Sequence, residues 1–211
     1  MIWIFGVTCL LLLPVVGITI FSWRFQARRA RVHDLPAVVN NAREIHKALY
    51  EFDVEYGEFP RASTISRVQG DTSTTMPLGT ATSNDYFRQL LAMGLGNEKM
   101  FYSGSRKFRK PDDLYSGAKA LQKRECGFAY VIGLSISEDA STPLVISPVI
   151  RGAHRFDPEP LEGKAVVLRI DGSAIRYPIM KDGKIDMGGG VYLDPARPEW
   201  NGKPLTIAWP E

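Results

Sequence analysis

The sequence predicts an α+β protein in which an N-terminal transmembrane helix continues into a long amphipathic helix packed on a small antiparallel sheet. Three observations lead to this prediction. An uncharged apolar segment spans residues 2–23, a stretch of helical periodicity follows at 38–56, and short strand-like runs fill the chain from Gly127 onward. Because helices come first and strands afterwards, the pattern favours an α+β over an alternating α/β arrangement.

Length and composition indicate one folded domain behind the apolar segment. Of the 211 residues, 45% are hydrophobic and 23% are charged, which excludes collagen-like, disordered and disulfide-scaffold chains. We expect a transmembrane helix at 1–24, a juxtamembrane and amphipathic helix at 25–60, and an α+β globular domain at 61–211 packed on that helix. The net charge of +3 comes from basic residues spread along the chain, so we expect no nucleic-acid partner.

Residues 2–23, IWIFGVTCLLLLPVVGITIFSW, are long enough to cross a bilayer as a helix. Trp3 and Trp23 lie near its ends, where indole rings favour the headgroup level. A cleaved signal peptide is the alternative, but the run is long for one and no basic residue precedes it. We therefore expect a retained single-pass anchor in the lipid of the inner (cytoplasmic) membrane.

The charges that flank this segment indicate an orientation. Four arginines follow the segment and none precedes it; they are Arg24, Arg28, Arg29 and Arg31. The positive-inside rule, taken alone, places the following residues in the cytoplasm. Cys9 lies in the apolar segment and Cys126 lies far along the soluble part, so we expect no disulfide between them. The two cysteines therefore do not indicate whether the domain lies in a reducing or an oxidising compartment.

Residues 34–57 have the pattern of an amphipathic helix. Asp34 can cap its N-terminus, and Gly57 can supply a left-handed C-cap before Pro60 blocks continuation. Apolar side chains recur three or four positions apart and form one stripe, which we expect to pack on the sheet. The predicted seam residues are Val38, Ala42, Ile45, Leu49, Phe52 and Tyr56. The opposite face carries Arg43, Glu44, Lys47, Glu51 and Glu55.

The helix NNAREIHKALYEFDVEYGEFP, joined to an apolar N-terminal helix, resembles the type IV pilin and type II secretion pseudopilin family, whose helix ends in Y-G-x-[FY]-P. The stretch AVVLRIDGSAIRYPI is similar to a hairpin of pilin-like proteins. The resemblance implies a pilin-like fold and a structural role in a type II secretion or pilus-like envelope apparatus. It also implies other pilin-like or secretion-system subunits as partners, and a globular domain on the periplasmic side.

The family's processing site is degenerate in this sequence. Prepilins have a basic leader, a Gly before an aromatic residue or Met, and a Glu five residues into the mature chain. Here the leader charges are missing, Phe5 and Gly6 stand in the reverse order, and the apolar segment has no Glu. The resemblance therefore does not extend to peptidase processing, or to polymer assembly that depends on that Glu.

In the globular domain we expect a long loop over 61–83, which is rich in Ser, Thr and Gly, followed by a short helix that begins with Ser83 as its cap and ends near Gly94. Asp171-Gly172 predicts a hairpin turn, and Asp182-Gly183 a second turn. The predicted strands lie in FAYVIGLSI, PLVISPVI, AVVLRI, SAIRYPI and PLTIAWP.

No pattern makes a convincing enzyme, and we expect neither catalytic residues nor a small-molecule substrate. Ser116 and Lys119 match the S-x-x-K spacing of serine acyl-transfer enzymes, but the companion motifs are absent. The histidines, at His33, His46 and His154, have neither H-E-x-x-H spacing nor a neighbouring cysteine pair, so no zinc site is expected.

The stretch KDGKIDMGGGVYLDP places Asp182, Asp186 and Asp194 around a Gly-rich turn, where carboxylate and backbone oxygens can bind Ca²⁺. It also resembles the Gly- and Asp-rich C-terminal loop by which some major pseudopilins bind calcium. The spacing is not that of an EF-hand, and aspartates are common in turns without metal. Calcium is the one cofactor that the sequence suggests.

Two other functions stay open. A membrane-anchored, non-catalytic binding or adaptor domain that faces the cytoplasm agrees with the arginine flank. An anchored envelope hydrolase rests on Ser116 and Lys119 alone. The side of the membrane on which the domain lies separates the adaptor from the pilin-like component.

Overall fold

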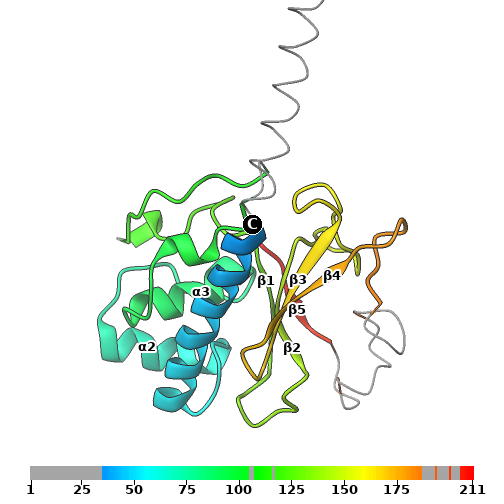
Figure 1. Cartoon of the computed structure of the whole chain (residues 1–211). Helices are drawn as coiled ribbons and strands as arrows, with labels where there is room; N and C mark the ends of the chain where they lie inside the picture. The colour runs from blue at the N-terminus through cyan, green and yellow to red at the C-terminus, as the bar shows by residue number, and fades with distance from the viewer. Residues whose placement is uncertain (1–34, 105–106, 116, 187–192, 194–199, 201–204) are drawn as a thin grey trace, which may run out of the picture.

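The structure is a computed structural model that describes residues 35–104, 107–115, 117–186, 193, 200 and 205–211. These residues form an α+β unit, with the helices gathered on one side of a five-stranded antiparallel sheet (Figure 1). The predicted fold class is therefore confirmed at the level of α+β. Among the residues described, no helix is long and apolar enough to cross a membrane. The predicted transmembrane helix at 1–24 lies outside them.

The first described helix spans residues 35–56, and we call it the long helix. It ends as the sequence predicts, because Gly57 has φ +75° and its N–H donates to the Asp53 carbonyl at 2.7 Å. The predicted cap, Asp34, lies outside the described residues. On the charged face, Glu44 pairs with Lys47, three positions further along the helix, at 2.9 Å.

The predicted loop over 61–83 is wrong in its first half, which folds as η1 (Ala62–Thr64) and α2 (Ile65–Thr72). Only Val68 of α2 is buried, so the apolar pattern is too short to reveal a helix by periodicity. Tertiary contacts stabilise it instead: the Thr64 hydroxyl donates to Gln89 of the next helix at 2.5 Å. A short Ser- and Thr-rich helix depends on such contacts because its own propensity is low.

Helix α3 (Ser83–Ala92) is confirmed, but its cap is Thr82 rather than Ser83. Thr82 Oγ1 accepts the Asp85 N–H at 3.3 Å, and an Asp85 carboxylate oxygen accepts the Thr82 N–H at 2.9 Å, which is a capping box. The Ser83 hydroxyl is thereby free to donate to the Phe128 carbonyl at 2.7 Å. Ser83 therefore joins the start of α3 to the sheet.

All five predicted strand runs contain a strand. The strands are β1 (Ala129–Val131), β2 (Pro143–Ser147), β3 (Lys164–Arg169), β4 (Ala174–Pro178) and β5 (Ile207–Ala208). Their spatial order is β4-β3-β2-β1-β5, with every neighbour antiparallel. Two short 3₁₀ helices, η2 (Glu98–Phe101) and η3 (Gly117–Lys119), lie in the segment between α3 and β1.

Strand side chains alternate between two apolar layers, so both faces of the sheet are covered. The layer under the helices includes Phe128, Tyr130, Leu144, Val166 and Leu168. The opposite layer includes Ala129, Ile146, Ala165, Val167, Phe156 and Ile185. Double coverage explains why every residue of β2 is buried.

The predicted hairpin at Asp171-Gly172 is confirmed and joins β3 to β4. The Gly172 N–H donates to the Arg169 carbonyl at 3.1 Å and closes the turn. The Arg169 N–H donates in turn to the Ser173 carbonyl at 3.0 Å. Gly172 itself has a left-handed conformation, with φ +80°. A Cβ on Gly172 would lie 2.9 Å from the His46 ring. The hairpin therefore approaches the long helix so closely that any larger residue at 172 would have to displace the His46 ring.

Candidate functional site

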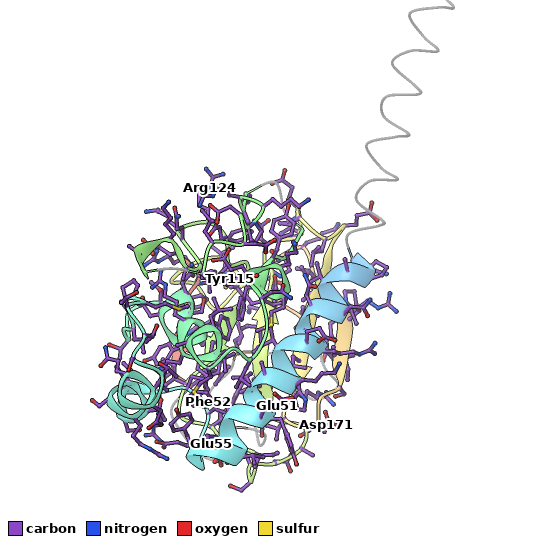
Figure 2. The ribbon with its side chains drawn as sticks, turned by 90° about the vertical axis from the view of Figure 1, so that its left-hand side faces the viewer. Glu51, Phe52, Glu55, Tyr115, Arg124 and Asp171 are labelled. Atoms are coloured by element: carbon purple, nitrogen blue, oxygen red, sulfur yellow. The ribbon has the colours of Figure 1, made fainter. Side chains whose placement is uncertain are left out.

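The long helix packs its predicted seam into the main core. All six seam residues are buried, none exposing more than 5% of its surface, and they share one apolar cluster with the strand residues Tyr130, Leu144 and Val166. Phe52 is fully buried in this contact, and its ring centroid lies 4.5 Å from that of Tyr56. In Figure 2, Phe52 points from the helix into the body of the domain. The seam thus joins the helix to the sheet.

Polar contacts add to the apolar seam near the middle of the helix and near its C-terminus. His46 Nε2 lies 2.8 Å from the Ile170 carbonyl, next to the β3–β4 hairpin. Nearer the C-terminus, the buried Asp53 accepts the Ile136 N–H at 3.3 Å. Burial raises the pKa of Asp53, the Ile136 N–H opposes that rise, and the charge of Glu58 adds to it. The register of the helix on the sheet is therefore fixed by hydrogen bonds as well as by packing.

The outward face of the long helix is mostly charged but carries two large apolar side chains. Glu51 and Glu55 are exposed, and Figure 2 shows both on the near side of the helix. Beside them Tyr50 exposes 47% of its surface and Val54 exposes 70%. The helix that follows the predicted anchor therefore presents a face to solvent along its described length.

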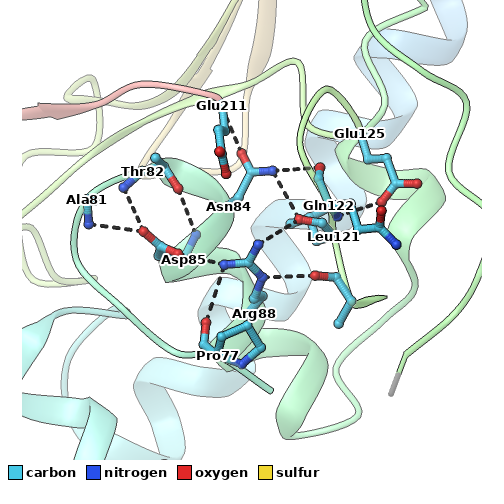
Figure 3. Close-up of polar contacts among 11 residues, drawn as sticks. Pro77, Ala81, Thr82, Asn84, Asp85, Arg88, Leu121, Gln122, Glu125 and Glu211 are labelled. Carbon is cyan, nitrogen blue, oxygen red and sulfur yellow. Dashed lines mark hydrogen bonds and ion pairs between the residues drawn. The ribbon is translucent and has the colours of Figure 1, made fainter. Parts of the chain in front are cut away.

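Arg88 of α3 organises the irregular chain that precedes β1 (Figure 3). Its Nε donates to the Ala120 carbonyl at 2.9 Å, and its Nη2 donates to the Leu121 carbonyl at 3.0 Å. Nη1 donates to the Asp85 carboxylate at 2.6 Å and to the Pro77 carbonyl at 3.3 Å. The guanidinium thus satisfies carbonyls that no helix or strand pairs.

Asn84, also on α3, extends the same network. Its side-chain amide donates to the Leu121 and Gln122 carbonyls, each at 3.1 Å. Its carbonyl oxygen accepts the Glu211 N–H at 3.2 Å. Buried side chains of α3 therefore position the turn at 121–125, which has little regular structure of its own (Figure 3).

This turn brings three carboxylates together, and we call Glu98, Asp112 and Glu125 the acidic cluster. One oxygen of each lies within 4.8 Å of the corresponding oxygens of the other two. Glu98 and Glu125 are fully buried, whereas Asp112 is exposed. The cluster is therefore closed toward the core and open toward solvent at Asp112.

Two members of the acidic cluster are held by hydrogen bonds. Glu125 Oε1 accepts from Arg109 Nη2 at 2.7 Å, and its Oε2 accepts the Gln122 N–H at 2.6 Å. Asp112 Oδ1 accepts the Leu114 N–H at 3.1 Å. Each of these oxygens keeps acceptor capacity, because a carboxylate offers about four lone-pair sites.

Glu98 is less well satisfied. Its Oε1 accepts the Leu121 N–H at 2.5 Å, but its buried Oε2 has no hydrogen bond of ordinary geometry to any described residue. The pKa of Glu98 is raised, chiefly by burial. The Leu121 N–H opposes this rise, the charges of Glu125 and Asp112 add to it, and the Asp113 N–H also opposes it. A buried carboxylate oxygen without a partner costs free energy, which marks this position as unusual.

The predicted calcium residues are described in part. Asp182 Oδ1 accepts the Lys184 N–H at 3.1 Å, and the other carboxylate oxygen lies 3.7 Å from Lys184 Nζ. Asp186 is exposed, and Asp194 lies outside the described residues. Calcium at these three aspartates stays a prediction.

The remaining candidates are not brought together. Ser116 and His33 lie outside the described residues, and Lys119 is exposed in η3. His46 contacts the Ile170 carbonyl, and His154 is exposed in a turn between β2 and β3. Sequence reasoning missed the acidic cluster, because its members are far apart in the chain and belong to no motif. For the Arg88 network the sequence holds one weak indication, which is a charged residue among the apolar side chains of α3.

Comparison of the chain with protein-family models finds no match, and searches of curated proteins and of solved structures find no significant similarity.

Proposed function

We propose that this chain is a membrane-anchored, pseudopilin-like structural component of a type II secretion or pilus-like envelope apparatus. In this proposal residues 1–24 span the inner membrane once, and the globular domain lies on the periplasmic side. The chain acts by packing and assembly with other pilin-like or secretion-system subunits. No residue is catalytic.

The observation that supports the proposal most is the long helix. It follows the apolar segment closely in the sequence, buries its predicted seam against an antiparallel sheet, and ends at Gly57 in the left-handed conformation. An anchor helix that continues into a sheet-packed helix couples the membrane segment rigidly to the domain. Such coupling suits a subunit whose neighbours are arranged by helix packing in the bilayer.

The exposed face of the same helix agrees with an assembly role. Val54 exposes 70% of its surface and Tyr50 exposes 47%, on a helix whose other outward side chains are mostly charged. The S-x-x-K match offers no comparable support for a hydrolase, because the described Lys119 is exposed and contacts no buried nucleophile in the described parts of the chain.

The experiment that tests this function is lysine-directed crosslinking of the full-length chain in isolated native membranes, with partners identified by mass spectrometry. The proposal predicts crosslinks to a second copy, or to other single-pass proteins with an apolar N-terminal helix followed by an amphipathic one. Crosslinks only to soluble cytoplasmic proteins would favour the anchored adaptor instead.

A matched variant locates the contact. Lys47 is an exposed lysine of the long helix, and Lys123 is an exposed lysine of the turn next to the acidic cluster. Lys47→Arg keeps the charge but removes the reactive amine. Crosslinks that pass through the helix face should disappear in this variant, while those through Lys123 should remain.

A further inference from the structure

The acidic cluster has an uncompensated charge. When its three carboxylates are ionised they carry three negative charges. Among the described residues, Arg109 is the one basic side chain that forms an ion pair with the cluster, through Glu125. Lys99, the nearest lysine in the sequence to Glu98, pairs instead with Asp113 at 2.5 Å. The three carboxylates and Arg109 together therefore have a net charge of about −2, which a single divalent cation would neutralise.

The unpartnered oxygen of Glu98 is the second observation. Its side chain is fully buried and belongs to the cluster, yet its Oε2 has no hydrogen bond of ordinary geometry to any described residue. Well-packed proteins rarely leave such an atom unsatisfied unless an ion, a water or a proton occupies the position. The atom therefore points to a ligand that the protein itself does not supply.

The type of the ligands favours calcium among divalent ions. Two oxygens on opposite sides of a calcium ion lie about 4.8 Å apart at bond lengths of about 2.4 Å, so oxygens within that spacing can bind one ion, and magnesium demands a more regular octahedral site. The ligand oxygens of the acidic cluster all lie within 4.8 Å of one another. Three carboxylates, with water entering beside the exposed Asp112, form the oxygen-rich and partly hydrated site that calcium accepts.

We propose that Glu98, Asp112 and Glu125 bind one calcium ion, which joins η2, the 111–113 segment and the turn before β1. This site is distinct from the Asp182, Asp186 and Asp194 prediction, and it does not depend on the proposed envelope function. The segment between α3 and β1 contains only two short 3₁₀ helices. A bound ion would stabilise this segment where backbone ladders do not.

The test uses the full-length chain in detergent, stripped of metal with a chelator and then titrated with CaCl₂, with thermal unfolding and isothermal titration calorimetry as readouts. The proposal predicts one calcium per chain at this site and a melting temperature that rises with calcium concentration, as expected for a ligand that binds only the folded state. Absence of any shift at about millimolar calcium, the weak end of protein sites, would overturn it.

Two variants assign the site. Glu98→Gln keeps the shape of the side chain and removes its charge, and Asp112→Asn keeps the acceptor for the Leu114 N–H at an exposed position where folding is least at risk. Each should weaken calcium binding at least about tenfold, since an ionised ligand of the ion is lost. Asp182→Asn is the matched control and should leave this affinity unchanged.

Two other outcomes would overturn the proposal. Unchanged calcium binding in Glu98→Gln and Asp112→Asn, with loss in Asp182→Asn, would place the ion in the C-terminal loop. Equal or greater stability of Glu98→Gln, together with an unchanged calcium response, would show that Glu98 holds a proton instead.

Discussion

Removal of the Arg88 guanidinium should destabilise the protein strongly. Its side chain is only 8% exposed, and it satisfies three backbone carbonyls and the Asp85 carboxylate. Arg88→Met should lower the free energy of unfolding by about 3 kcal/mol or more, because it leaves buried acceptors without donors. Urea denaturation followed by circular dichroism measures this change.

The matched control for Arg88 is Lys47. Its ion pair with Glu44 is exposed on both sides, at 67% and 57%. Lys47→Met should change the free energy of unfolding by less than about 0.5 kcal/mol. Equal effects of the two substitutions would contradict the structural role assigned to Arg88.

Two aspartates should give opposite dependence of stability on pH. Burial raises the pKa of Asp53 above 3.8, so its ionisation opposes folding as pH increases beyond that value. The free energy of unfolding of Asp53→Asn, relative to the native chain, should therefore rise with pH from about 3.8 through the raised pKa and then level off. Urea titrations between acidic and neutral pH measure the difference.

Asp139 provides the control of opposite sign. Hydrogen bonds from the Ser141 hydroxyl and N–H lower the pKa of Asp139 below 3.8, so its stabilising effect is lost as pH falls through the lowered pKa. Relative to the native chain, Asp139→Asn should lose stability as pH rises toward 3.8. If the stability of Asp53→Asn and of Asp139→Asn, each relative to the native chain, changed with pH in the same direction, the environments assigned to the two carboxyl groups would be wrong.

The long helix depends on its inward side chains. Phe52 is fully buried, whereas Val54, two residues away, exposes 70% of its surface. Phe52→Ala should cost about 3–5 kcal/mol, and Phe52→Asp should unfold the domain, as should a charge at Ile45. Limited proteolysis measures this. A folded, protease-resistant Phe52→Asp variant would contradict the packing, whereas Val54→Asp should remain resistant.

The β3–β4 hairpin is fitted closely to the long helix. Gly172 has φ +80°, and a Cβ there would meet the His46 ring at 2.9 Å. Gly133 has a similar φ of +86° with no atom of the described structure within 4 Å of a Cβ. Gly172→Ala should therefore destabilise more than Gly133→Ala, by about 1–3 kcal/mol in thermal or urea unfolding, because it adds overpacking to backbone strain. Equal losses would mean that the helix and hairpin are not in contact.

At the scale of the whole molecule, the sequence predicts the elements that carry their own repeating signal. The long helix, α3 and the strands follow from apolar periodicity, and the hairpin follows from Asp171-Gly172. The sequence does not predict helix α2, because Val68 is its only buried residue and gives no apolar periodicity. The sequence does not predict the acidic cluster either, because its members come together only through tertiary contacts, including those of Arg88 and Asn84 with the turn at 121–125.

The native thiol is unsuitable for mapping the side of the membrane on which the domain lies. Cys126 is fully buried, and burial raises its pKa to about 12, so the reactive thiolate is scarce. A maleimide should label Cys126 only after denaturation. Ala140, in an exposed turn between β1 and β2, is a better position for an introduced cysteine.

The measurement that tests the central claim most directly is therefore labelling of Ala140→Cys with a membrane-impermeant maleimide in intact spheroplasts, beside the unsubstituted chain and lysed and denatured samples. A periplasmic, pilin-like domain predicts labelling of the introduced cysteine before lysis, with no labelling of the unsubstituted chain. Labelling only after lysis would place the domain in the cytoplasm, as the arginine flank favours, and would contradict the pseudopilin-like role.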